Sequence, residues 1–256
     1  MKLFTKEFTH TIQKAFDLHE DTATHEEIQQ RILSGGQVTG TNMCVLICAI
    51  LIASVGLNTG STAVIIGAML ISPLMGSILA MAYSTAAADF VRFRRHFYGF
   101  MIQLIISGCV STLYFLLSPI NEPSAELLAR TQPSAYDVII ATAGGLAGIV
   151  GSTRKDKANN IIPGVAIATA LMPPVCTCGY SLAHLEWQML AGAMYLFMVN
   201  TYFIFLSAVI ILEVLNIPKV NTLTDKQWKR VKKAMIRNTI LILLPCIPLT
   251  FFMLAK

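Results

Sequence analysis

The sequence contains few charged residues. Asp, Glu, Lys and Arg together make up 13% of its 256 residues, whereas hydrophobic residues make up 55%. Soluble domains carry about 25% charged residues, so this composition excludes an ordinary soluble fold. The 6 cysteines all lie in apolar stretches. Cysteine in such surroundings behaves as a small hydrophobic residue, which argues against a disulfide framework.

Acidic residues are missing from the interior of the apolar stretches, and Asp89, Asp137 and Glu213 lie at their ends. A cation site or proton relay within a membrane normally needs an acid at depth, so this pattern favours a neutral or anionic ligand. No phosphate-binding loop, metalloprotease helix or dinucleotide fingerprint is present. No basic cluster is interleaved with stacking aromatics. We therefore expect no enzymatic activity, no cofactor, no metal and no nucleic-acid partner.

Two other kinds of site have weaker support in the residues. Cys176 and Cys178, with Met172 and His184, offer soft ligands for Cu(I). A Cys-x-Cys pair on a helix, however, places its two thiols on different faces. An intramembrane hydrolase would need a nucleophile held beside a base, and His184 has no matching serine motif.

Long apolar runs dominate the chain, and a membrane-spanning helix needs about 20 such residues. The runs cover residues 42–57, 62–83, 97–117, 136–152, 161–183, 190–212 and 239–255. They predict an all-α integral membrane protein with seven transmembrane helices. All but two of the 19 Lys and Arg residues fall in segments that are cytoplasmic if the N-terminus is cytoplasmic; the exceptions are Arg130 and Lys256. The positive-inside rule therefore predicts this orientation.

Segments outside the first six spans have amphipathic patterns. Residues 1–40 are predicted to form a cytoplasmic helical segment, because large apolar side chains recur every four residues over positions 4–16. Residues 219–237 are predicted to form a basic interfacial helix, in which Lys226–Arg237 contacts anionic lipid headgroups. Residues 239–256 would form the seventh transmembrane helix.

Two apolar runs are interrupted by proline, about a hundred residues apart, at Ser72-Pro73 and at Pro173-Pro174. Proline removes a helix hydrogen bond and clashes with the preceding turn. Paired interruptions of this kind indicate a transporter built from inverted repeats, with its binding site between them. We expect residues 41–118 and 136–214 to form the two repeats, each with three spans and one proline-broken helix.

The predicted binding site lies between the two breaks. Half-helices that start there would direct their positive dipole ends toward the membrane centre. Nearby hydroxyl and amide side chains offer neutral donors, and Gly76 permits close backbone approach. The predicted site residues are Ser72, Pro73, Gly76, Ser77, Gln103, Thr169, Pro173, Pro174, Thr177 and Asn200. The structural alternative is that the prolines only kink helices whose neighbours restore the lost contacts.

Three motifs resemble the uncharacterised hydrophobic domain proteins, a bacterial and archaeal family of unknown function numbered 389. They are VIIGAMLISPLMG at Val64–Gly76, AGGLAG at Ala143–Gly148 and IPGVAIATALMPP at Ile162–Pro174. The resemblance covers roughly residues 40–215. It implies a multi-pass protein of the inner (plasma) membrane whose activity is unassigned.

We expect a transporter or channel-like carrier for a small, preferentially anionic solute bound at the paired breaks. A homo-oligomer is also expected, since glycine-rich faces and the seventh span offer contact surfaces. The alternative is a non-transporting membrane scaffold or sensor that acts through its cytoplasmic amphipathic helices. A polar cavity at both breaks would favour transport, and continuous helices packed without a cavity would favour the scaffold.

Overall fold

The structure is a computed structural model that describes residues 22–155, 161–220 and 225–254, with side chains described outside 161–170, 225–227 and 247–254. In this part the chain is helical, and an isolated antiparallel bridge between Thr22 and Arg154 is the sole extended pairing. The helices are α2 (His25–Gly35), α3 (Gly40–Asn58), α4 (Thr62–Leu70), α5 (Leu74–Ala86), α6 (Phe90–Leu117), α7 (Ala125–Ala129), α8 (Ala135–Ser152), α9 (Ile161–Ala183), α10 (Trp187–Val214) and α11 (Asp225–Leu254).

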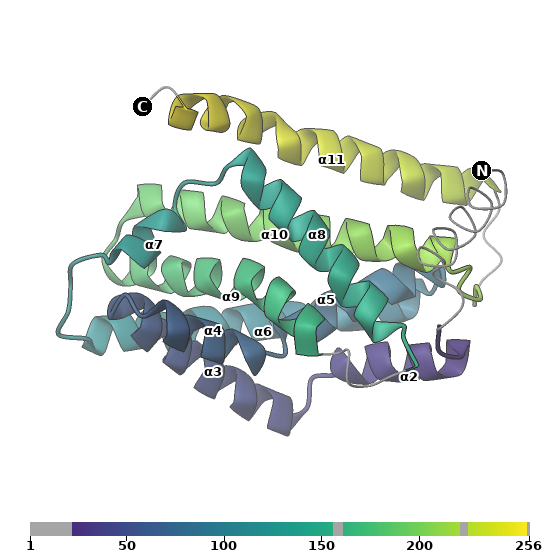
Figure 1. Cartoon of the computed structure of the whole chain (residues 1–256), viewed down its shortest axis with the longest axis horizontal. Helices are drawn as coiled ribbons and strands as arrows, with labels where there is room; N and C mark the ends of the chain where they lie inside the picture. The colour runs from purple at the N-terminus through teal and green to yellow at the C-terminus, as the bar shows by residue number, and fades with distance from the viewer. Residues whose placement is uncertain (1–21, 156–160, 221–224, 255–256) are drawn as a thin grey trace, which may run out of the picture.

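The long helices run along one axis of the molecule (Figure 1). Helix α9 packs against α6 and α10, and α8 crosses this group at an angle. Helix α11 lies along the edge of the bundle. It is attached by two tyrosines of α10: the Tyr195 hydroxyl donates to the Ile242 carbonyl at 2.6 Å, and the Tyr202 hydroxyl donates to the Met235 carbonyl at 2.6 Å.

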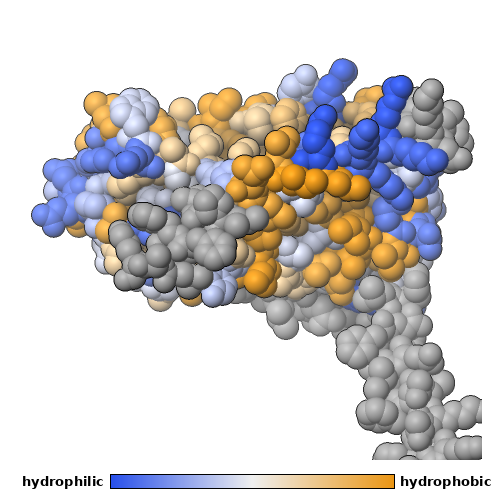
Figure 2. Space-filling view, turned by 90° about the horizontal axis from the view of Figure 1, so that it is seen from above, coloured by the Kyte–Doolittle hydropathy of each residue, from blue (hydrophilic) through white to orange (hydrophobic). Residues whose placement is uncertain are grey.

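Several helices are apolar and long enough to cross a membrane. In the described residues these are α3, α6, α8 and α10, and α4 with α5 would form a fifth span that bends by 47°. Hydrophobic side chains gather across the middle of the face in Figure 2, with hydrophilic ones toward its two ends. The all-α, multi-pass architecture is thus supported, while seven spans and an inverted repeat stay predictions.

The predicted break at Ser72-Pro73 is confirmed. Helix α4 ends at Leu70, and α5 begins at Leu74 with Pro73 at its N-cap position. Serine usually takes the N-cap and proline the first helical position, which would start the helix one residue earlier. The Ser72 hydroxyl still receives the Leu74 N–H, at 3.5 Å, so serine caps the new helix locally.

The predicted break at Pro173-Pro174 is wrong, because α9 is one continuous helix with both prolines inside it. A bend there would separate buried side chains on both sides of the prolines, since Leu171, Met172 and Cys176 are at most 2% exposed. The structural alternative therefore holds for α9: its neighbouring helices restore the contacts that the prolines remove. Packing on the surrounding helices outweighs the local cost of the two missing N–H groups.

Helix α2 is integrated into the bundle and packs along α5. Ile28 and Ile32 are buried, and the Tyr83 hydroxyl donates to the Gln29 side chain at 3.4 Å. The apolar face of α2 is therefore already covered within the chain, which removes the surface that the scaffold alternative needs on this helix. The amphipathic pattern over residues 4–16 lies outside the described residues.

The predicted interfacial helix and seventh span are not separate elements. Most of residues 219–237 and nearly all of 239–256 fall in the single helix α11. Its basic half carries Trp228, whose ring faces the ammonium groups of Lys219 at 4.4 Å and Lys232 at 5.8 Å from the ring centroid. These cation–π contacts hold basic side chains at the start of the helix.

A glycine contact joins α2 to the start of α5, and this contact predicts a large effect of one added methyl group. A Cβ on Gly76 would collide with the backbone of Gly35, whereas a Cβ on Gly67 in α4 would meet nothing within 4 Å. We expect Gly76→Ala to destabilise the protein by about 1–3 kcal/mol because backbone must move. Thermal unfolding of purified protein in detergent would show a melting temperature lowered by about 2–10 °C.

Gly67→Ala is the matched control. It should leave the melting temperature unchanged or raise it, because alanine stabilises a helix interior more than glycine does. Equal melting temperatures for Gly76→Ala and the parent protein would contradict the close α2–α5 packing.

Candidate functional site: a buried polar seam on helix α6

Helix α6 carries polar side chains on the face that packs inside the bundle. Gln103, Ser107 and Ser111 follow one another at four-residue spacing and are all 0% exposed. Side chains four residues apart lie on the same face of a helix, so the three form a line. With Ser54 of α3 and Ser77 of α5, both also fully buried, they make up what we call the polar seam.

One end of the seam is fully hydrogen-bonded. The Ser111 hydroxyl donates to the carbonyl of Cys176 in α9 at 3.0 Å and lies 3.1 Å from the Ser54 hydroxyl. Ser111 has a single O–H and uses it on the carbonyl, so Ser54 must be the donor to Ser111. The chain of bonds joins α3, α6 and α9, and it leaves none of these polar atoms unsatisfied.

The other end of the seam is only partly hydrogen-bonded. The Ser77 hydroxyl donates to Oε1 of Gln103 at 2.9 Å. Nε2 of Gln103 and Oγ of Ser107 are buried and have no hydrogen-bond partner among the described protein atoms. These two groups lie one turn apart on α6, a rise of about 6 Å. The seam thus holds an amide nitrogen, which can only donate, one turn from a hydroxyl that can donate or accept.

An unsatisfied buried amide is costly. Leaving a buried polar group without a partner costs about 1–3 kcal/mol, and native proteins do so rarely. Such a group needs an explanation, and a bound hydrogen-bond acceptor is one of the standard ones. Gln103 and Ser107 therefore offer two unpartnered hydrogen-bonding groups to a small acceptor.

Two of the residues predicted for the site form part of the seam, and a third is buried on α10. Ser77 and Gln103 bond to each other directly. Asn200 of α10 is 4% exposed, and it is not among the unpartnered groups of the described residues. The rings of Phe100 and Phe197, three residues before Gln103 and Asn200, stack with centroids 6.1 Å apart.

The other predicted site residues have structural roles or lie outside the described part. Ser72 and Pro73 form the turn between α4 and α5, and Gly76 is occupied by its contact with Gly35. The Thr177 hydroxyl donates to the carbonyl of Pro173 at 2.9 Å within α9. Pro174 sits in the same helix interior, and the side chain of Thr169 is not described.

Ser54, Ser107 and Ser111 were absent from the predicted site. The spacing of Gln103, Ser107 and Ser111 is visible in the sequence as a polar residue every four positions in an apolar run. That spacing indicates a polar helix face in the membrane, and such faces point to the bundle interior. Ser54 has no comparable signal, because its partner is 57 positions away.

The soft-metal alternative gains no supporting geometry. Within the described residues, no group of three or more His, Cys, Asp and Glu side chains gathers as a metal site. Cys176 is fully buried, with its Sγ 4.0 Å from the carbonyl of Ile50, and the His184 ring stacks on Tyr180.

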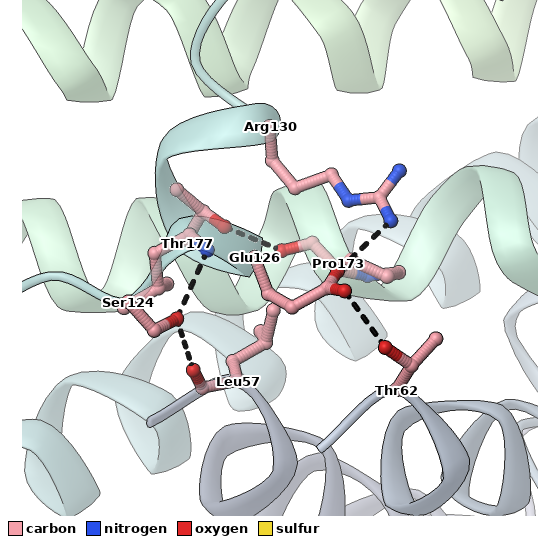
Figure 3. Close-up of polar contacts among 8 residues, drawn as sticks. Leu57, Thr62, Ser124, Glu126, Arg130, Pro173 and Thr177 are labelled. Carbon is pink, nitrogen blue, oxygen red and sulfur yellow. Dashed lines mark hydrogen bonds and ion pairs between the residues drawn. The ribbon is translucent and has the colours of Figure 1, made fainter. Parts of the chain in front are cut away.

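Helix α7 covers the ends of α3 and α4 that lie away from α2 (Figure 3). The Ser124 hydroxyl donates to the carbonyl of Leu57 at the end of α3. Thr62, the first residue of α4, donates to Glu126 at 2.8 Å, and Arg130 pairs with the same carboxylate at 3.5 Å. Figure 3 also draws the Thr177–Pro173 bond of α9. A carboxylate at the start of α4 is well placed to stabilise its helix dipole.

Comparison with known proteins identifies the family. The profile described as "Domain of unknown function (DUF389)" matches residues 69–206, which is more than half of the chain and includes Ser77, Gln103 and Ser111. The chain belongs to this family. An uncharacterized protein of the archaeon Methanocaldococcus jannaschii is 28% identical over 170 residues, covering 66% of this chain and 52% of that protein. The chain thus spans about half the length of this relative. No solved structure matches the chain.

The hydrogen bond between Ser77 and Gln103 predicts opposite effects for two substitutions. Ser77→Ala removes the partner of Gln103 Oε1 and leaves the whole amide unsatisfied, so we expect a loss of about 1–3 kcal/mol of stability. Gln103→Leu removes the amide altogether, and because the Ser77 hydroxyl can turn to a carbonyl of its own helix, we expect unchanged or higher stability.

Thermal unfolding of the two single variants and the double variant forms a double-mutant cycle that measures this coupling. The double variant should recover the stability that Ser77→Ala loses. A strongly destabilised Gln103→Leu variant would mean that the amide is fully satisfied by protein atoms, and would remove the case for a ligand there.

Proposed function

We propose that this protein is a membrane transporter or channel-like carrier for a small solute, preferentially an anion, which binds at the polar seam. The observation that carries the proposal is the fully buried amide nitrogen of Gln103, which has no hydrogen-bond partner among the described protein atoms. A polar group kept unsatisfied inside an apolar bundle is costly, and intramembrane polar groups commonly mark a substrate or ion pathway.

The chemistry of the seam favours a ligand that accepts hydrogen bonds. The Gln103 Nε2 group is a donor only, and the Ser107 hydroxyl can donate as well. Ser77, which holds Gln103 in place, lies in the first turn of α5, next to the positive end of that helix. Neutral donors beside a helix N-terminus suit a small anion or a carboxylate better than a metal cation.

The helix contacts support two related halves. Helix α6 packs on α9, and α10 packs on α5, as an axis relating spans one to three with spans four to six would require. Phe100 and Phe197, which occupy equivalent places in the motifs FMIQ and FMVN, contact each other as residues near such an axis would. We therefore keep the inverted repeat, the seven spans and the cytoplasmic N-terminus in the inner membrane as parts of the proposal.

The mechanism differs from the one expected from the sequence. Two half-helices meeting at the membrane centre require two breaks, and α9 has none. A continuous helix at this place favours the scaffold alternative, so the transport proposal rests on the unpartnered amide of Gln103 alone. The proposal therefore assigns the movement to the connection between α4 and α5, where the helix is already interrupted at Ile71–Pro73. Changing the angle between α4 and α5 would open the seam with little further loss of backbone hydrogen bonds.

Flux measurements test the proposal. Purified protein reconstituted in liposomes is assayed with a panel of labelled small anions and cations, with protein-free liposomes as the background. We expect flux of at least one anion, lowered at least about tenfold by Gln103→Leu, because the substitution removes the amide donor of the seam. Ser107→Ala should lower the flux less, since one hydroxyl is lost and the amide stays.

Ser84→Ala is the control. Ser84 is buried like Gln103 and Ser107, but it lies on α5 and donates to the Ala80 carbonyl of its own helix. Its flux should equal that of the parent protein. Flux of cations alone, equal flux in Gln103→Leu and the parent protein, or no flux of any solute would overturn the proposal.

A further inference from the structure

A second polar feature, separate from the seam, lies at the beginning of α6. A space of about 400 Å³ opens between the α2–α3 connection and the first third of α6. We call it the interfacial groove, and the residues that define it are Gly36, Gln37, Val38, Arg92, Arg95 and Tyr98. It shares no residue with the polar seam.

One end of the interfacial groove is cationic. Arg92 and Arg95 both line it, and none of the described lining residues is acidic. The carboxylate of Asp89 pairs with Nε of Arg92 at 3.1 Å and also caps α6 by accepting the Arg92 N–H at 3.0 Å. Nη1 of Arg92 is buried and has no hydrogen-bond partner among the described residues. The Arg92 side chain is 41% exposed and Arg95 is exposed, so both guanidinium groups can reach an anion in the groove.

The other end of the interfacial groove is apolar and faces outward. Val38 is 41% exposed, Tyr98 58% and Ile102 47%. Val38 packs directly on Gly99, where an added Cβ would lie 2.7 Å from its side chain, so these two residues form one wall of this end. From Arg92 to Ile102 the groove runs about 15 Å along α6.

The two ends match the layers of a bilayer. The apolar run of this span starts at residue 97, so Arg92 and Arg95 precede it, at headgroup depth, and Ile102 lies within the hydrocarbon. Tyrosine at the boundary is typical of the membrane interface, and arginines there bind phosphate groups. The buried His96 ring closes the inner wall, where its Nδ1–H donates to the Gly36 carbonyl at 3.1 Å.

We propose that the interfacial groove binds one anionic phospholipid. Arg92 and Arg95 hold the phosphate through charge-assisted hydrogen bonds, and an acyl chain lies against the exposed side chains of Val38, Tyr98 and Ile102. A soluble anion would leave the apolar end uncovered, and a zwitterionic lipid would bring an ammonium group toward two arginines. Charge complementarity with the two arginines therefore selects an anionic lipid, and the site is independent of the transport proposal.

Lipid retention tests the proposal. The purified protein is titrated in detergent with phosphatidylglycerol and, separately, with phosphatidylcholine, and bound lipid is counted by native mass spectrometry. We expect one phosphatidylglycerol per chain held at least about tenfold more tightly than phosphatidylcholine. Arg92→Gln with Arg95→Gln should abolish this preference, because both phosphate contacts are lost.

Arg94→Gln is the matched control, since Arg94 makes the same charge change on the same helix but does not line the groove. It should retain the parent preference. Arg95→Gln alone, at an exposed position, should weaken binding about tenfold without affecting folding, and it stands in for the double variant if that variant does not fold.

Three results would overturn the proposal. The first is an equal loss in Arg94→Gln, which would indicate diffuse attraction to positive charge. The second is equal retention of the two lipids. The third is displacement of the lipid by inorganic phosphate or glycerol phosphate at concentrations matching the lipid, which would indicate a soluble-anion site without an acyl contribution.

Discussion

Every backbone polar group inside a membrane must find its hydrogen-bond partner within the protein, and the region between α4 and α5 is where this requirement is hardest to meet. The chain meets it with short local turns. The Ile71 N–H bonds to the Ala68 carbonyl at 3.3 Å, the Ser72 N–H to the Met69 carbonyl at 3.2 Å, and the Gly76 N–H to the Pro73 carbonyl at 3.2 Å. The backbone N–H groups at the break thus find their partners in tighter helical turns on either side of it.

The position of this break determines much of the structure around it. Helix α5 must start within the protein, and its first turn contacts α2 through Gly76 and α6 through Ser77. Gly76 is needed there because the backbone of Gly35 takes the place of a side chain. Ser77, one position later, turns toward α6 and engages Gln103. The bond between Ser77 and Gln103 is therefore a direct consequence of where α5 begins, which links the fold to the proposed binding site.

The sequence predicted the features that depend on local chemistry. Ser-Pro in an apolar run is a helix stop followed by a helix start, and it behaved so at Ser72-Pro73. Gln103 stood out as an amide in an apolar run and proved buried at the seam. The family resemblance over the proline motifs was likewise confirmed.

The features that depend on packing were missed or mistaken. Pro173-Pro174 carries a stronger local signal than Ser72-Pro73, yet α9 stays continuous because its neighbours bury both sides of the prolines. The partner of Ser54 is Ser111, a contact set only by how α3 and α6 meet. The end of one amphipathic segment and the start of the last span were separated in the prediction, whereas α11 joins them in one helix.

A map of the protein in lipid nanodiscs, at a resolution that shows ordered small molecules, tests the central claim most directly. The account predicts density for a solute or a water molecule within about 3 Å of Nε2 of Gln103, on the side toward Ser107. Apolar side chains packed against that nitrogen, or protein carbonyls that receive its two N–H groups, would contradict the account.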